Sequence, residues 1–285
     1  MDEQILQDGG HFELSPMYHS FVLTDVLDLM NLLSAFPLPD LAMKVHLSQL
    51  QTAAVDMLHW LDTMCHPDGE ISFFNDAAFN VAPTPEAIRS YASRLGVETR
   101  DSFVTQNTPF IKRCPDSGYA ALEVNNAKLL VDVASIGPDY QPGHGHADTL
   151  SFELSLFGKR MLVNRGTSQY GTGEERQVER RTAAHNTVVI NGENSSEVWA
   201  GFRVARRAKP FGLVFHKNDD SITVSCSHDG YKRLSGCPVH RRSWRLTDNT
   251  LLIEDKVEGA FETATAYFHF HPLIINYIFL FLFLL

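Results

Sequence analysis

Two histidine-containing segments carry the residue types best suited to chemistry. The first, GHGHADTLSFEL at 143–154, places His144 and His146 two residues apart. In an extended segment such neighbours point to opposite sides, so one histidine can serve a metal while the other faces a cleft. The second segment, TAAHNTVVING at 182–192, contains His185 just before an apolar run. A lone histidine there is more often structural, and we give it a ligand role only if it meets His146 in space.

A third segment, DGGHFELSPMYH at 8–19, sets a tyrosine at the start of a predicted helix. Ser15 is a favourable N-cap and Pro16 suits the first helical position, so Tyr18 falls in the first turn. The partial positive charge of a helix N-terminus favours a phenolate over a phenol. An unperturbed tyrosine has a pKa of about 10, so work as a base needs such help. Taken alone, Tyr18 is an aromatic residue on an apolar helical face, and the core interpretation is then the stronger one.

The first 99 residues must position that tyrosine, and their apolar residues recur every three or four positions. This period predicts a first helix from Ser15 to about Pro37, a second over about 39–63, and a third that Thr84 caps and Gly96 ends. Three helices joined by such loops do not form a self-sufficient bundle. We expect a helical layer that packs against another part of the chain.

From about residue 100 the apolar period changes from 3.6 to two residues. Turn signals such as Asn191-Gly192 separate the apolar runs. The predicted strands are 118–124, 128–136, 149–157, 160–164, 187–190, 211–216, 221–227, 239–246, 250–257 and 262–270. Many short antiparallel candidates without an intervening helical period indicate a β-sandwich. The predicted fold class is therefore an α+β multidomain chain, with helices first and an antiparallel β-sandwich second.

The charge of the chain divides at the same place. The net charge is −10, and residues 1–99 hold 14 acidic and 3 basic residues. Seven basic residues gather within 34 positions: Arg176, Arg180, Arg181, Arg203, Arg206, Arg207 and Lys209. This basic cluster is either a set of solvated strand faces or a surface for an anionic partner. Nucleic acid is disfavoured as that partner, because the whole chain is acidic and shows no nucleic-acid motif.

Composition argues against a disordered chain, a collagen and a coiled coil. With 44% hydrophobic and 20% charged residues, the chain has the composition of an ordinary globular protein. Its four cysteines form no CxxC pair, which argues against a thiolate zinc knuckle. The first residues carry no signal peptide. The apolar tail at 273–285 is too short for a membrane span, which needs about 20 residues, and we expect an aberrant end rather than an anchor.

Together these blocks resemble the C-terminal half of heparinase II/III-like polysaccharide lyases. The resemblance covers about residues 4–271 and is carried by the His-Gly-His-Ala-Asp block, the Ala-His-Asn-Thr block and the tyrosine segment. It implies the end of an (α/α) toroid over 1–99, packed against a β-sandwich over 100–272. It also implies β-elimination at a uronic acid of an anionic polysaccharide bound between the two parts, in a protein of the periplasm or cell envelope.

The resemblance assigns roles to individual residues near the substrate. Tyr18 matches the catalytic tyrosine, which acts as base and also as acid, and His144 matches the histidine that lines the cleft. Tyr170 matches a cleft tyrosine that contacts substrate. Arg181 and Arg203 are candidates for binding carboxylate or sulfate, because guanidinium groups suit such planar anions.

The resemblance also implies a structural zinc ion. His146 and His185 match two zinc ligands, and the third position, an Asp in the family, is Asn164 in the segment MLVNRGT. An amide oxygen is a neutral and weaker zinc ligand than a carboxylate. Zinc binding is therefore expected to be weakened.

The family also has an Asn-His pair that neutralises the substrate carboxylate, on helices that would precede Tyr18. We expect this chain to be an N-terminally truncated fragment without that pair. Two alternatives to a lyase remain open. One is a non-catalytic carbohydrate-binding or vestigial module. The other, more distant, is a metal-dependent hydrolase that uses His144, His146, Asp148 and His185. The sequence does not indicate the oligomeric state.

Overall fold

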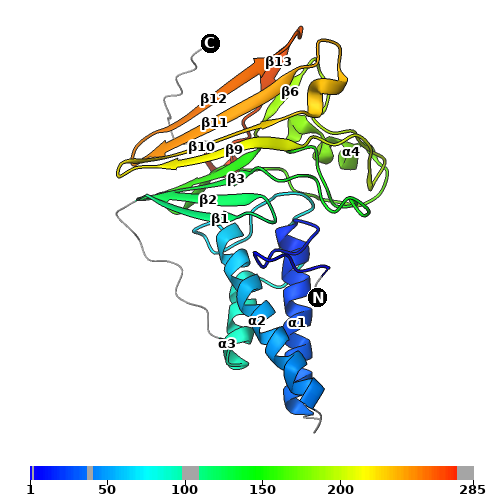
Figure 1. Ribbon diagram of the computed structural model, residues 1–285, viewed down its shortest axis with the longest axis vertical. Helices are drawn as coiled ribbons and strands as arrows, with labels where there is room; N and C mark the ends of the chain where they lie inside the picture. Colours follow the sequence, from blue (N-terminus) through cyan, green and yellow to red (C-terminus); the bar gives the residue numbers. More distant parts are fainter. Residues whose placement is uncertain (2, 37–40, 98–108, 275–285) are drawn as a thin grey trace.

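The chain folds into a helical part and a part built of antiparallel sheets (Figure 1). The structure is a computed structural model that describes residues 1, 3–36, 41–97 and 109–274. The predicted boundary near residue 100 falls outside these residues, and so does nearly all of the tail at 273–285. Within the described ranges, no helix combines the length and apolar character that crossing a membrane requires. All four cysteines are free thiols.

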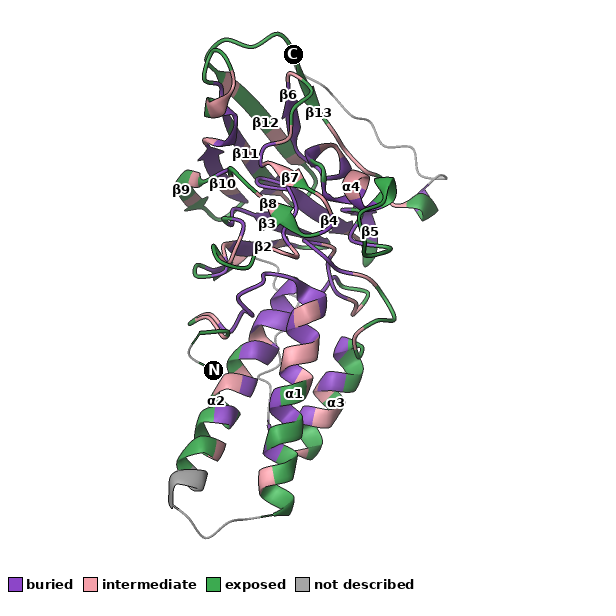
Figure 2. Cartoon of the chain, turned by 90° about the vertical axis from the view of Figure 1, so that its right-hand side faces the viewer, coloured by how far each residue is buried: buried purple, intermediate pink, exposed green. Residues whose placement is uncertain are grey.

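The three predicted helices are present: α1 (Pro16–Ala35), α2 (Leu41–Met64) and α3 (Pro85–Arg94). Ser15 and Thr84 cap α1 and α3 as expected, each accepting a hydrogen bond from a backbone N–H in the first turn. Apolar residues of α1 and α2, among them Leu27 and Leu58, share one buried cluster. The halves of α1 and α2 nearer the sheets are mostly buried, whereas their far ends are largely exposed (Figure 2).

Two antiparallel sheets form the second part. The first has strand order β1 (Phe110–Cys114), β2 (Tyr119–Val124), β3 (Ala127–Asp132), β4 (Phe152–Leu156) and β5 (Lys159–Leu162). The second has strand order β12 (Leu251–Glu258), β11 (Val239–Thr247), β10 (Ser221–His228) and β9 (Pro210–Lys217). Leu129 and Phe152 of the first sheet share a buried apolar cluster with Val224 and Trp244 of the second. The period-two pattern arises from this shared core, because alternate side chains face it.

Two smaller strand pairs complete the fold. β6 (Val188–Ile190) pairs with β13 (Ala264–Ala266), and β7 (Val198–Trp199) pairs with β8 (Arg203–Val204). The strands β1, β7 and β8 lie outside the predicted set. A helix, α4 (Glu174–Arg180), also interrupts the predicted all-strand region. With only seven residues, α4 is too short to give a detectable apolar period.

The C-terminal end of α2 packs against the first sheet. Trp60 donates a hydrogen bond from Nε1 to Ser117 Oγ at 2.8 Å, and the Tyr119 hydroxyl donates to the Leu14 carbonyl at 2.9 Å. His66 and Glu153 are both fully buried and meet at 2.7 Å between Nε2 and Oε2. These contacts bring the loop between α2 and α3 against the sheet, and this loop supplies the centre of the site described next.

Candidate active site

Tyr18 lies in the first turn of α1, where the Ser15 side chain caps its backbone N–H at 3.2 Å. The same Ser15 hydroxyl donates to the carbonyl of Asp76, in the loop between α2 and α3, at 2.5 Å. The start of α1 is thus fixed to that loop. The position of Tyr18 therefore depends both on α1 and on the hydrogen bond from Ser15 to the loop that carries Asp76.

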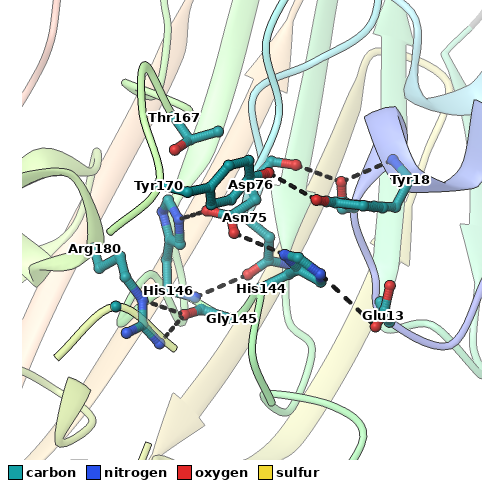
Figure 3. A network of polar contacts seen from close by, with 12 residues as sticks. Glu13, Tyr18, Asn75, Asp76, His144, Gly145, His146, Thr167, Tyr170 and Arg180 are labelled. Carbon is teal, nitrogen blue, oxygen red and sulfur yellow. Dashed lines mark hydrogen bonds and ion pairs between the residues drawn. The ribbon is translucent and has the colours of Figure 1, made fainter. Parts of the chain in front are cut away.

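Tyr18 and His144, which come from opposite parts of the sequence, are in contact (Figure 3). Their ring centroids are 3.9 Å apart, with 31° between the ring planes. The Tyr18 hydroxyl is 2.9 Å from that of Tyr170, in the loop between β5 and α4. Tyr170 is 44% exposed, so solvent and ligands reach this group. The structure thus brings together Tyr18 and His144, the two residues that the resemblance places at the substrate cleft.

Asp76 joins the site together, although its carboxylate is fully buried. One of its oxygens is 2.8 Å from His144 Nδ1, and the other is 2.8 Å from His146 Nε2. The guanidinium of Arg176, also fully buried, binds both oxygens. Burial by itself would raise the pKa of Asp76, but these hydrogen bonds and charges outweigh burial and hold that pKa well below its usual range. Asp76 is therefore a carboxylate that only accepts hydrogen bonds.

This carboxylate sets the tautomer of each histidine. His144 must donate from Nδ1 and His146 from Nε2, because an ionised carboxylate has no proton to give. In the neutral ring, His144 Nε2 then carries a lone pair. This atom is 3.9 Å from Glu13 Oε1, too far for a hydrogen bond, and the His144 side chain keeps 18% exposure. His144 can therefore accept a proton at Nε2 from a bound ligand.

The segment 143–148 consists of turns and bends rather than extended chain, and the strand predicted at 149–157 is present as β4, which begins at Phe152. Asn75 accepts from the His146 backbone N–H at 3.0 Å, and Arg180 donates from Nη2 to the Gly145 carbonyl at 2.9 Å. The expectation that His144 and His146 point to opposite sides is wrong in one respect. Both rings reach the same carboxylate, because a turn does not alternate its side chains as a strand does.

The electrostatic surroundings of Tyr18 also differ from the expectation. Burial raises the pKa of Tyr18 above its ordinary value, and the nearby Asp76 and Glu13 carboxylates raise it further. Only the hydrogen bond with Tyr170 and the charge of Arg176 act in the opposite direction. Burial and the two carboxylates thus act against the effect expected of the helix N-terminus, and a pKa raised above 10 leaves Tyr18 a phenol at rest.

His146, Asn164 and His185 converge, as predicted. The two imidazole centroids are 5.2 Å apart, and Asn164 Oδ1 is 3.2 Å from His185 Nδ1. His146 Nδ1 and His185 Nε2 are buried without a hydrogen-bond partner. Two imidazoles bound at about 2.1 Å to one tetrahedral ion would have centroids about 5 Å apart, so the spacing of the two rings matches that of a pair of ligands to one ion. The third donor fits less well, because the amide oxygen of Asn164 faces the other nitrogen of His185.

The remaining candidates, Arg181 and Arg203, are both exposed and lie outside the Asp76 network. The arginine within the network is Arg176, and its neighbour Arg180 is also buried. The basic cluster is thus neither a uniform solvated face nor a uniform anion site. Arg176 and Arg180 form buried hydrogen bonds within the site, and Arg203 begins the strand β8, where its carbonyl accepts a hydrogen bond from Arg180.

Sequence reasoning missed Asp76 and Arg176. Asp76 lies in the segment 71–82, which has no regular period, and a single carboxylate in a loop has no pattern that identifies it. The sequence contains only an indirect indication of this carboxylate. Two histidines in one short segment need hydrogen-bond partners that set their tautomers, and a carboxylate is one such partner. Arg176 was visible only as a member of the basic cluster.

Known proteins share both parts of this chain. The family described as "Heparinase II/III N-terminus" matches residues 1–94, and that described as "Heparinase II/III-like, C-terminal" matches residues 106–276. A heparin-sulfate lyase of Bacteroides stercoris is 25% identical over 272 residues, which make up 90% of this chain and 38% of that protein.

Solved structures share the fold. A heparinase III superposes with a TM-score of 0.68 at 18% identity, over 90% of this chain and 41% of that one. Heparan sulfate lyase HepC from Pedobacter heparinus gives 0.62 at 18% identity, over 90% of this chain and 40% of that one. The chain spans about two fifths of the length of these relatives. Because the C-terminal description alone matches more than half of its residues, the chain belongs to the heparinase II/III-like family.

Proposed function

We propose that this chain is part of a polysaccharide lyase that cleaves an anionic glycan at a uronic acid by β-elimination. The observation that carries the proposal is the contact of Tyr18 with His144 and Tyr170, three groups able to move protons that come from three distant segments. Family membership and the relatives named as heparin-sulfate and heparan sulfate lyases support the same chemistry.

The reaction requires one base and one acid. The base takes the proton on C5 of the uronic acid, the electrons of that bond form a C4–C5 double bond, and the C4–O bond breaks. The leaving oxygen then receives a proton. We assign both proton transfers to Tyr18, and we assign His144 the role of accepting a hydrogen bond or a proton at Nε2 beside the reacting carbons. Electrostatic stabilisation of the developing negative charge is expected to be the largest single contribution.

The raised pKa of Tyr18 has a consequence for the order of these steps. A phenol is ready to protonate the leaving oxygen, but it must lose its proton before it acts as base. The neighbouring Tyr170 hydroxyl, 2.9 Å away, is already protonated and its pKa is raised by burial, so it donates a hydrogen bond to the Tyr18 phenolate while the Tyr18 proton leaves to solvent. If Tyr18 is the base, kcat/KM must rise with pH as the phenolate fraction grows. A profile that is flat across the alkaline range would instead assign the base role to His144.

The carboxylate of the substrate also has to be neutralised, since the C5 proton is otherwise not acidic enough. Arg176 does not supply this charge, because both oxygens of Asp76 already bind it. We therefore expect the neutralising groups to come from another part of the whole protein, and this chain by itself to be weakly active. A non-catalytic glycan-binding module stays the second candidate for the isolated chain.

We also propose that the zinc site survives in weakened form. His146 Nδ1 and His185 Nε2 would hold the ion, with Asn164 as a poor third ligand. When bound, zinc would act structurally, joining the segment of His146 to that of His185. The hydrolase alternative is not supported. Within the described residues no three side chains of His, Cys, Asp or Glu are arranged to hold a metal, and His144 faces Tyr18 and Asp76 instead.

We interpret the helices as the end of an (α/α) toroid and the two sheets as a β-sandwich. Leu29, Leu32 and Phe36 on the far half of α1 are 50%, 55% and 68% exposed, as expected of a face that further toroid helices would cover. By family resemblance we place the whole protein in the periplasm or cell envelope.

The test uses this chain and a version extended to the length of its relatives, each incubated with heparan sulfate and other uronate glycans. The product is followed by the absorbance of its new double bond. Tyr18→Phe should reduce the rate about 10²–10⁴-fold, the usual contribution of a proton-transfer group. Cleavage without a double bond would indicate hydrolysis. Inactivity of the extended protein on every uronate would overturn the lyase assignment.

A further inference from the structure

The hairpin formed by β7 and β8 is fixed next to the site by Arg176 and Arg180, the two buried arginines of α4. Arg176 donates from Nε to the Gly201 carbonyl at 2.9 Å, and Arg180 donates from Nη2 to the Arg203 carbonyl at 3.3 Å. Gly201 packs so closely that an added Cβ would lie 2.4 Å from the Gly171 carbonyl oxygen. Hydrogen bonds from Arg176 and Arg180 therefore fix the backbone of this hairpin. Because Arg176 also binds Asp76, the hairpin is connected directly to the Asp76 network.

Aromatic side chains of the hairpin are exposed and continue the site outward. Phe202 is 47% exposed, and its ring centroid is 6.4 Å from that of His144. It also stacks on Tyr170, with 5.8 Å between centroids and 19° between planes. Trp199, three residues earlier, is 52% exposed. Exposed aromatic rings of Tyr170 and Phe202 thus adjoin His144, and the same hairpin carries the exposed Trp199.

A cation lies directly beside that tryptophan. Trp199 and Arg203 face each other across the strand pair, with the guanidinium carbon 5.5 Å from the ring centroid. The next two arginines are neutralised, Arg206 by Glu197 and Arg207 by Asp139. In the part of the chain that the structure describes, no carboxylate pairs with Arg203. An exposed indole and an uncompensated cation are therefore adjacent, on the same hairpin as Phe202, whose ring lies beside His144.

We propose that Trp199 and Arg203 form a subsite for an acidic sugar unit of the glycan, separate from the unit that reacts at Tyr18. A pyranose ring has an apolar C–H face that packs on an aromatic ring, while a carboxylate or sulfate on its edge binds a guanidinium. Isolated exposed aromatic residues need no such explanation, but Trp199 lies beside a cation on the hairpin whose Phe202 adjoins the reacting groups. This proposal rests on the proposed function and adds where a second sugar unit binds.

The fluorescence of Trp199 can also report whether the proposed subsite is occupied. The chain has three tryptophans, and Trp60 and Trp244 are each only 1% exposed. Acrylamide, a neutral quencher dissolved in water, should therefore quench Trp199 selectively. We would titrate heparan sulfate hexasaccharides into the Tyr18→Phe chain, which leaves the glycan intact, and measure binding heat and fluorescence quenching in parallel.

Saturation with the hexasaccharide should at least halve the accessibility of Trp199 to acrylamide. Trp199→Ala should weaken binding about tenfold, since exposed aromatic anchors dominate such interfaces. Arg203→Gln should weaken binding about three- to tenfold and reduce its salt dependence, because one exposed charge pair is lost. Arg206→Gln is the matched control, since that arginine is already paired with Glu197 and should change affinity less than twofold.

The outcomes separate this proposal from the proposed function. Binding heat without protection of Trp199, together with unchanged affinity of Trp199→Ala, would overturn the subsite and leave the lyase proposal standing. Equal losses in Arg203→Gln and Arg206→Gln would reduce Arg203 to general surface charge and overturn its assigned role. No binding heat with any uronate glycan, in this chain and in the extended protein, would overturn both proposals.

Discussion

Replacement of Asp76 by Asn tests whether one buried carboxylate organises the site. The substitution keeps the shape of the side chain but removes its charge and replaces one of the two accepting oxygens with an amide N–H₂. The guanidinium of Arg176, which is fully buried, then loses its counter-charge. Since the remaining oxygen cannot accept from both rings, either His144 or His146 loses the acceptor that fixes its tautomer.

The expected loss of stability is large, because removal of one partner from a buried ion pair typically costs about 3–5 kcal/mol. Since a domain is stable by only about 5–15 kcal/mol, urea unfolding should show a clearly lower midpoint. Asp139→Asn is the matched control, because the Asp139 side chain is fully exposed although it also pairs with an arginine. That control should leave the midpoint unchanged within error.

A double variant separates charge balance from histidine orientation. Asp76→Asn combined with Arg176→Gln leaves no buried charge unpaired, so a substantial part of the lost stability should return. The tautomers of His144 and His146 should not both return, because the single amide oxygen can accept from only one of the two rings. Long-range ¹H–¹⁵N spectra of the histidines report both tautomers without any need for activity. Two results would refute the reasoning: an Asp76→Asn chain as stable as the parent, or spectra in which His144 keeps its proton on Nδ1 and His146 keeps its proton on Nε2.

Three further predictions concern other parts of the chain. Asn164→Asp should raise the zinc retained after dialysis, measured by elemental analysis, because a carboxylate is a stronger zinc ligand than an amide; unchanged zinc content would show that Asn164 is not a ligand. Burial lowers the pKa of His19 from 6.5 to about 3 and outweighs its hydrogen bond to the Met57 carbonyl. Because the unfolded chain then binds this proton first, the free energy of unfolding should fall as pH drops from 6.5 towards 3, on the order of 4 kcal/mol in total. His19→Asn should flatten that dependence and the exposed His46→Asn should not; equal slopes in both variants would contradict the assignment. Gly201→Ala should disturb the hairpin at Trp199 and increase local amide exchange there, since its Cβ would meet the Gly171 carbonyl; unchanged exchange would show that this close packing does not fix the hairpin.

The secondary structure of the helical part was largely predictable, because its signals are local. Ser15 with Pro16 and Thr84 with Pro85 mark helix starts by capping chemistry that needs no distant partner. Most strands were predictable for a similar reason, since the shared core of the two sheets imposes the period of two. The helix α4 was not predictable, because it is short and its Arg176 and Arg180 are buried by partners far along the chain.

The sequence by itself determined which residues are chemically capable: Tyr18 at a capped helix start, the paired histidines of the 143–146 segment, and His185 before an apolar strand. Residue type and short-range spacing carry that information, because capping and turn formation act over a few residues. Only the tertiary structure decided what those residues do. It placed Asp76 between His144 and His146, raised the pKa of Tyr18 by burying it near two carboxylates, and placed the Trp199 hairpin beside the site. These effects depend on burial and on contacts between segments up to 152 residues apart, such as Tyr18 and Tyr170, and no local pattern encodes them.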